Sequence, residues 1–173
     1  MIPWIPAGKQ TWQVKGEEMS MLPAQRGLFF EEFEAGQHVT TPGRTITEGD
    51  IVTFAGLSGD YNTIHTNAEY SRTTPFGKRI AHGLLVLSIA SGLVTRSGIM
   101  EGTVMAFREI ENWKFIKPVF IGDTIHVEIE VTETKAIPRL GGGTVYINLQ
   151  VNNQSNEVVM KGNWNALFMS KPA

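Results

Sequence analysis

The longest apolar stretch of the chain, Ala81 to Ser97, limits the possible folds more than any other feature. It reads AHGLLVLSIASGLVTRS, with apolar residues nearly all round and a single charge near its end. This pattern predicts a helix that is buried on most sides. A stripe of small residues at helical spacing would let a strand or a ligand approach closely: Ser88, Ser91, Gly92 and Thr95.

The second half of the chain alternates in the way that β-strands do. Residues 103–120, 124–136, 143–153 and 157–168 are rich in β-branched and aromatic side chains and are separated by turn residues. Within TIHVEIEV, every second residue is apolar, so one face of the sheet is expected to be buried. A sheet of this kind can wrap around the apolar helix, and an open edge strand would favour dimerisation by sheet extension.

The segment before the helix predicts shorter elements. An interrupted strand is expected over 38–46, followed by short helices over 48–57 and 67–72. Thr47 with Asp50, and Thr66 with Glu69, have capping-box spacing and mark the expected helix starts. This order of elements indicates an α+β fold with an antiparallel sheet around one long helix.

Length and composition narrow the function classes. The 173 residues fit one domain, with residues 1–27 as an extended arm and 28–173 as the globular part. A net charge of −2 does not favour nucleic acid as a partner, and the absence of cysteine excludes disulfides and thiolate chemistry. We find neither an apolar run of the about 20 residues that span a bilayer nor a secretory signal. A cytoplasmic protein with no membrane partner is therefore expected.

The stretch SGDYNTIHTNAEYS, Ser58 to Ser71, has two interpretations. As a turn between two capped helices, its Gly, Asp and Asn residues need no further role. As a site, Asp60 and His65 would form an acid/base pair on a loop, because a five-residue spacing does not place them on one helix face. Gly83, in the first turn of the apolar helix, would offer a free N–H to a developing oxyanion. These parts suit the addition of water to an activated double bond, or its removal.

The same stretch resembles the hydratase motif of the MaoC-like, (R)-specific enoyl-CoA hydratase family, which has the hotdog fold. The matching residues are Phe54, Ser58-Gly59-Asp60, Asn62, His65 and Ser71. Thr63 stands where the family usually has proline. The downstream segments IAHGLLVLSIASGL and KPVFIGDTI resemble the central helix and a strand-turn-strand unit of the family, so the likeness covers about residues 29–168.

The resemblance implies an activity and a set of roles. Asp60 and His65 would activate one water, which adds to C3 of a trans-2-enoyl-CoA while the Gly83 N–H holds the thioester oxygen. Asn62, Ser58 and Ser91 would support the site. The implied partners are an acyl-CoA substrate and at least one further copy of the chain. No cofactor is implied, since CoA enters with the substrate.

Two other functions stay open. A hotdog acyl-CoA thioesterase, or an acyl-carrier-protein dehydratase, often carries an acidic residue on the central helix, and Ala81 to Ser97 contains none. A non-catalytic acyl-CoA-binding protein would not need the Asp60, Asn62, His65 and Gly83 set. His82 either shapes the helix start or is merely structural. No histidine pair has metal-site spacing, so no metal is expected.

Overall fold

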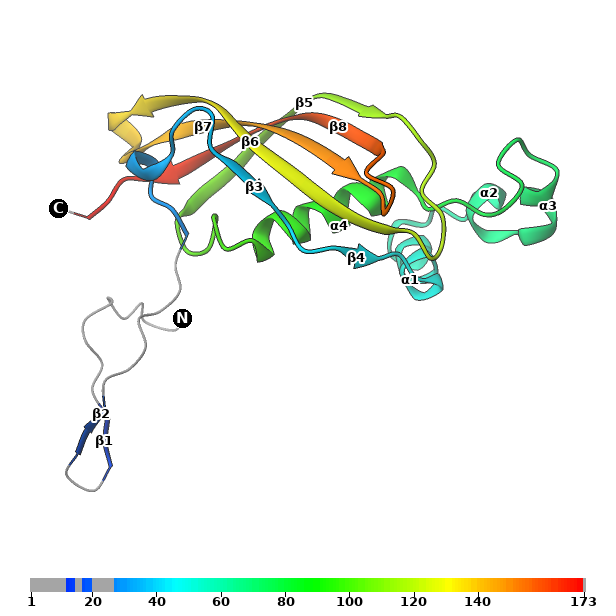
Figure 1. Ribbon diagram of the computed structural model, residues 1–173, viewed down its shortest axis with the longest axis horizontal. Helices are drawn as coiled ribbons and strands as arrows, with labels where there is room; N and C mark the ends of the chain where they lie inside the picture. Colours follow the sequence, from blue (N-terminus) through cyan, green and yellow to red (C-terminus); the bar gives the residue numbers. More distant parts are fainter. Residues whose placement is uncertain (1–11, 15–16, 20–26, 173) are drawn as a thin grey trace.

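A computed structural model of the chain describes residues 12–14, 17–19 and 27–172 (Figure 1). Strands β1 (Trp12–Val14) and β2 (Glu17–Met19) pair antiparallel with each other. They are the described part of the predicted arm, which over these residues forms a short strand pair and not a purely extended segment. The rest of the arm lies outside the described residues, so the division at residue 27 stays a prediction.

The domain is built on one antiparallel sheet of six strands, in the order β3-β6-β7-β8-β5, with β4 pairing to β6. Its longest strands are the four that lie in the strand-like segments of the second half of the sequence. Its strands are β3 (His38–Thr40), β4 (Arg44–Thr45), β5 (Val104–Phe115), β6 (Thr124–Ile137), β7 (Gly142–Asn152) and β8 (Val158–Met169). Single 3-10 turns, η1 (Phe30–Glu32) and η2 (Pro138–Leu140), complete the connections near the sheet. The predicted interruption of the first strand by Pro42-Gly43 and the four later strands are confirmed.

The long apolar helix, α4 (Gly83–Arg96), lies along one face of this sheet (Figure 1). Its buried residues meet the apolar face of the strands and form the core: Leu85, Val86, Ala90, Leu93 and Val94. The α+β class and the antiparallel sheet are therefore confirmed.

The expectation that α4 is buried on most sides is wrong for this chain. Leu84 is 61% exposed, and the stripe that includes Ser88, Ser91 and Gly92 faces away from the core. The sheet covers one side of the helix only, so the other apolar positions remain in contact with solvent.

Helix α1 (Glu48–Ser58) begins and ends where the sequence predicts. The Thr47 N–H donates to Asp50 Oδ2 at 2.7 Å, and the Asp50 N–H donates to Thr47 Oγ1 at 3.3 Å, which is a reciprocal capping box. The helix ends at Gly59, whose φ of 76° is left-handed and favours glycine. Asp60 therefore follows directly after a fixed helix end.

Two short helices come next and differ from expectation. Helix α2 (Thr63–Thr66) was not predicted, and it starts with Asn62, whose Oδ1 accepts from the Ile64 N–H at 3.3 Å. Helix α3 (Ala68–Arg72) is capped by Asn67 and not by the expected Thr66. The hydroxyl of Thr66 instead donates to the Tyr61 and Asn62 carbonyls. Among the described residues, none of the helices has the length and apolar character to cross a bilayer.

Candidate active site

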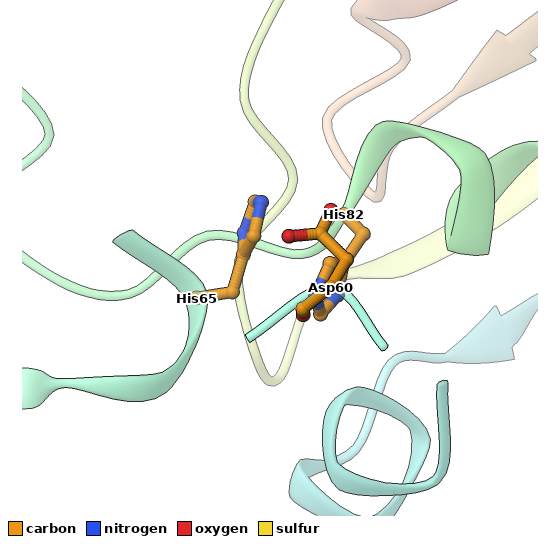
Figure 2. A group of neighbouring side chains, drawn as sticks. All are labelled: Asp60, His65 and His82. Atoms are coloured by element: carbon orange, nitrogen blue, oxygen red, sulfur yellow. The ribbon is translucent and has the colours of Figure 1, made fainter. Parts of the chain in front are cut away.

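Three short segments bring Asp60, His65 and His82 together (Figure 2). Asp60 follows the end of α1, His65 lies in α2 and His82 directly precedes α4. Each side chain has an atom within 4.8 Å of the others. The first two were singled out from the sequence, although His65 lies on a short helix and not on the expected loop.

The tautomer of His65 is set by a backbone carbonyl. Its Nδ1 lies 2.8 Å from the Ile80 carbonyl oxygen, which can only accept, so Nδ1 carries the proton and donates. Nε2 therefore keeps its lone pair. Partial burial lowers the pKa of His65, and the neighbouring His82 lowers it further, while the Ile80 bond and Asp60 act in the opposite direction. A neutral imidazole with a free Nε2 can accept a proton near pH 7.

Asp60 is exposed and is held by its neighbours in sequence. Its Oδ1 accepts from the Asn62 N–H at 3.2 Å, and its own N–H donates to Ser58 Oγ at 3.2 Å. The Ser58 hydroxyl donates in turn to the Phe54 carbonyl at 2.7 Å. Ser58 and Asn62 thus fix the main chain around Asp60, a position consistent with the supporting roles expected for them.

His82 is a site residue whose role the sequence left open. It is 2% exposed, and its Nε2 lies 2.9 Å from the Asp60 carbonyl oxygen. Its ring centroid is 3.9 Å from that of His65 and 5.0 Å from that of Phe54. The signal that pointed to it was its place directly before Gly83, but nothing in the spacing predicted contact with both members of the acid/base pair.

A metal ion could in principle use these three side chains, since each offers one ligand atom. The two imidazoles, however, lie nearly face to face, with their planes tilted by 32°. A metal binds along the plane of an imidazole ring, and in stacked rings those directions run side by side and do not converge. The arrangement suits proton transfer better than metal binding, and the absence of a metal stays a prediction.

A cavity of about 520 Å³ opens beside the pair. Its polar lining comes from Asp60, His65, His82 and Lys117, and Gly83 lines it as well. Apolar side chains from α4, β5, β8 and the connections before α4 and after β5 supply most of its wall, among them Phe76, Ile80, Leu84, Phe115, Val119 and Met160. A largely apolar cavity with a few polar groups in its wall is typical of a small-molecule site.

The N–H groups at the start of α4 face no partner inside their own helix, as at any helix N-terminus. His82 occupies the N-cap position, but its side chain makes no capping bond. Gly83, the first residue of the helix, lines the cavity and leaves room there for the ring of Phe115. An anionic oxygen in the cavity would meet the positive end of the α4 dipole.

Ser91 does not join this group. It lies two turns further along α4 on the exposed side of the helix and is not among the residues that line the cavity. The four residues that the structure does bring together with the pair are Ser58, Asn62, His82 and Gly83.

Residues 31–153, well over half of the chain, match the profile of the MaoC like domain. The chain belongs to the MaoC-like family. The solved structure of the monoamine oxidase regulatory protein from Archaeoglobus fulgidus superposes with a TM-score of 0.79 at 39% identity, covering 86% of this chain and 99% of that one. A double hotdog protein of Mycobacterium tuberculosis superposes with a TM-score of 0.74 at 19% identity, over 84% of this chain and 45% of that one. The expected hotdog fold is confirmed.

Relatives of this MaoC-like chain include named enzymes. The 3-hydroxybutyryl-CoA dehydratase of Methylorubrum extorquens is 37% identical over 65% of this chain and 69% of its own length. The (R)-specific enoyl-CoA hydratase of Rhodospirillum rubrum is 38% identical over 60% of this chain and 69% of its own. Protein MaoC of Klebsiella aerogenes is 43% identical over 58% of this chain. This chain covers only 30% of that longer protein. Relatives named as a dehydratase and a hydratase support a hydro-lyase at family level.

Proposed function

We propose that this MaoC-like chain is an (R)-specific enoyl-CoA hydratase, which adds water reversibly to a trans-2-enoyl-CoA and in reverse dehydrates a 3-hydroxyacyl-CoA. The observation that carries the proposal is His65, with its Nε2 left free, beside the Asp60 carboxylate in a mostly apolar cavity. The names of the Methylorubrum and Rhodospirillum relatives agree with this chemistry.

In the forward direction, Asp60 and His65 hold one water against C3 of the enoyl group. His65 Nε2 takes a proton from the water as its oxygen bonds to C3, and the π electrons of the double bond move toward the thioester carbonyl. The proton then passes from the pair to C2. One OH and one H have been added, and Asp60 and His65 return to their starting states.

During this step the thioester oxygen becomes enolate-like. The N–H of Gly83, at the positive end of α4, is the donor we assign to it, because helix N-termini stabilise negative charge and their amides are free to bond. The apolar wall of the cavity would take the acyl chain and exclude bulk water from the reacting carbons.

The CoA part requires contacts outside the cavity. A smaller depression of about 230 Å³ next to it is lined by Arg72, Lys78 and Arg79. Arg79 is paired with Glu48 and Arg72 with Glu69, whereas Lys78 lies 4.2 Å over the ring of Phe120. Lys78 is therefore the residue we expect to meet a CoA phosphate. We also propose a homodimer, with β5 as the contacting edge of the sheet.

The decisive assay is hydration itself. Purified protein should remove the enoyl-thioester absorbance of a panel of trans-2-enoyl-CoAs and release no free CoA, and the product should be the (R)-3-hydroxyacyl-CoA. Release of CoA without hydration would instead support a thioesterase, although α4 contains neither Asp nor Glu. Stoichiometric binding of crotonyl-CoA without turnover would support a non-catalytic acyl-CoA-binding protein.

A further inference from the structure

His82 is buried at the candidate site, yet the proposed reaction gives it no task. Because the Asp60 carbonyl only accepts, the Nε2 of His82 must carry the proton in their 2.9 Å bond. The Nδ1 lone pair is then left buried, with no hydrogen-bond partner in residues 27–172. An unpaired buried acceptor costs stability, so a histidine in this position calls for a compensating role.

The contacts of His82 reach both members of the acid/base pair. Its donated bond holds the main chain of Asp60, at a residue that no regular element fixes. Its ring packs against the ring of His65, with centroids 3.9 Å apart and a tilt of 32°. The ring of Phe54 packs on His82 in turn, at 5.0 Å. A single side chain thus links the end of α1, helix α2 and the start of α4.

The place of His82 in the helix adds a third connection. It is the N-cap residue of α4, a position whose side chain commonly bonds to the N–H groups of the first turn. The His82 side chain makes no such bond and is directed to Asp60. The first-turn N–H groups, including that of Gly83, are therefore left available to a substrate oxygen.

We propose that His82 is the positioning residue of this site, which fixes Asp60 through its Nε2–H and His65 through its ring face. The proposal rests on the proposed hydratase function for its kinetic test and on geometry alone for its spectroscopic test. His82 lines the same cavity but is 2% exposed, and the proposed reaction assigns no proton transfer to it. It acts by holding Asp60 and His65, and a misplacement of about 1 Å in such groups can cost about 10²-fold in rate.

Two substitutions separate the two contacts. His82→Gln keeps an N–H donor at a similar reach and removes the ring, whereas His82→Phe keeps a ring and removes the donor. We expect each to lower kcat by about 10- to 100-fold and to change KM little, because substrate binding uses other residues. His38 lies exposed in β3, so His38→Gln and His38→Phe serve as matched controls with wild-type kcat.

The spectroscopic test follows the imidazole nitrogens of His65 by NMR through a pH titration. Asp60 and His82 face His65, and Lys117 lines the same cavity. In the wild type the Nδ1–H tautomer of His65 should dominate. In His82→Gln the uncovered ring should titrate at higher pH, because both the cover and the charge of His82 are lost. In His82→Phe the rise should be smaller, because the cover is kept and only the charge of His82 is removed.

The outcomes are distinct. Wild-type kcat, corrected for the folded fraction by circular dichroism, together with an unchanged His65 titration in both His82 variants would overturn the proposal.

Should neither variant fold, Phe54→Leu loosens the packing on His82 without touching the pair. A lowered kcat in that variant supports the proposal, and an unchanged kcat overturns it. A wild-type protein that hydrates no enoyl-CoA would end the hydratase assignment, and the NMR titration would still decide the role of His82.

Discussion

A Cβ atom at Gly83 would lie 2.7 Å from Cε1 of Phe115, closer than real side chains come. Gly83 begins α4 and Phe115 ends β5, so this contact joins the helix start to the edge strand of the sheet. The aromatic ring therefore packs directly against the residue whose N–H we assign to the thioester oxygen. An alanine at this position would force the Phe115 ring to move, so glycine suits the packing here as well as the proposed chemistry.

We expect Gly83→Ala to reduce hydration sharply and stability little. Phe115 is 55% exposed and lines the cavity, so its ring can turn away from the new methyl group, but only by altering the cavity wall. The measurement is kcat and KM on a short enoyl-CoA, with the thermal unfolding midpoint alongside. Unchanged kinetics would argue against Gly83 as the oxyanion donor.

Gly92→Ala is the matched control on the same helix. No atom lies within 4 Å of the Cβ that it would gain. Alanine in a helix interior is favoured over glycine by about 0.5–1 kcal/mol. We therefore expect a slightly higher unfolding midpoint and wild-type kinetics.

Asp60→Asn and His65→Gln should each remove most of the hydration rate. General acid/base assistance is commonly worth ~10²–10⁴-fold, and either change ends proton transfer by the pair. Asp60 is exposed and His65 half-buried, so the fold should survive. Steady-state hydration and circular dichroism test this expectation. Glu69→Gln, which removes an exposed ion pair with Arg72, is the charge-matched control and should leave the rate unchanged. Wild-type rates in both site variants would contradict the assignment.

Stability and activity should both fall as the solution is acidified below pH about 6.5, the usual pKa of histidine. Burial lowers the pKa of His65 in the folded protein, so the unfolded chain binds that proton more readily. The contribution of His65 is thus fully present above the unfolded pKa and is lost as the pH falls through the folded one. Between pH 8 and pH 5, the thermal unfolding midpoint should decrease less in His65→Gln than in the wild type. An equal loss in both proteins would show that other groups cause it.

Asp50→Ala should destabilise the fold without affecting the chemistry. Asp50 accepts from the Thr47 N–H and also pairs with Arg44 at 2.5 Å, so one carboxylate secures the start of α1 and its approach from β4. Thr47 is the N-cap residue and keeps its bond to the N–H of residue 50, so we expect the loss to lie toward the lower end of the about 0.5–2 kcal/mol of a missing N-cap. Urea unfolding measures the loss, and kcat per folded molecule should stay at the wild-type value.

The exposed side of β5 should bind a second copy of the chain. This edge strand carries Met105, Phe107 and Ile110, which are 44%, 48% and 41% exposed. Contiguous exposed apolar residues on an edge strand favour association. We expect sedimentation to give a dimer for the wild type and a monomer for Ile110→Glu. Val52→Glu, at an exposed apolar residue of α1, should remain dimeric, and a dimeric Ile110→Glu would place the interface elsewhere.

The parts of the fold that could be predicted are those governed by local rules. The Thr47–Asp50 box and Gly59 bound α1 because capping depends on residues three or four apart. Helix α2 was missed because four residues carry no helical period, and its start depends on a single Asn62 bond. The exposure of Ser91 was missed because periodicity shows that a helix has two faces and not how much of it a sheet covers.

The candidate site, like the fold, could be predicted only where the signal was local in the sequence. Asp60 and His65 were singled out as an acid/base pair and Gly83 as a free N–H at a helix start, and the resemblance to a known motif then implied their roles. The contact of His82 with both members of the pair was not predicted. His82 lies 17 positions after His65 in the sequence, and the two rings meet only because α2 packs against the start of α4.

Helices α2 and α3 lie beyond the ends of the strands, outside the sheet (Figure 1). Ser71 is their one buried residue, and it ties them together by donating to the Ile64 carbonyl at 3.1 Å. His65 thus lies in a part of the domain that buries few apolar side chains against the core. On warming, these helices should detach while the sheet is still intact. Catalysis would then fail at a lower temperature than the fold, and cooling should restore it without refolding of the core.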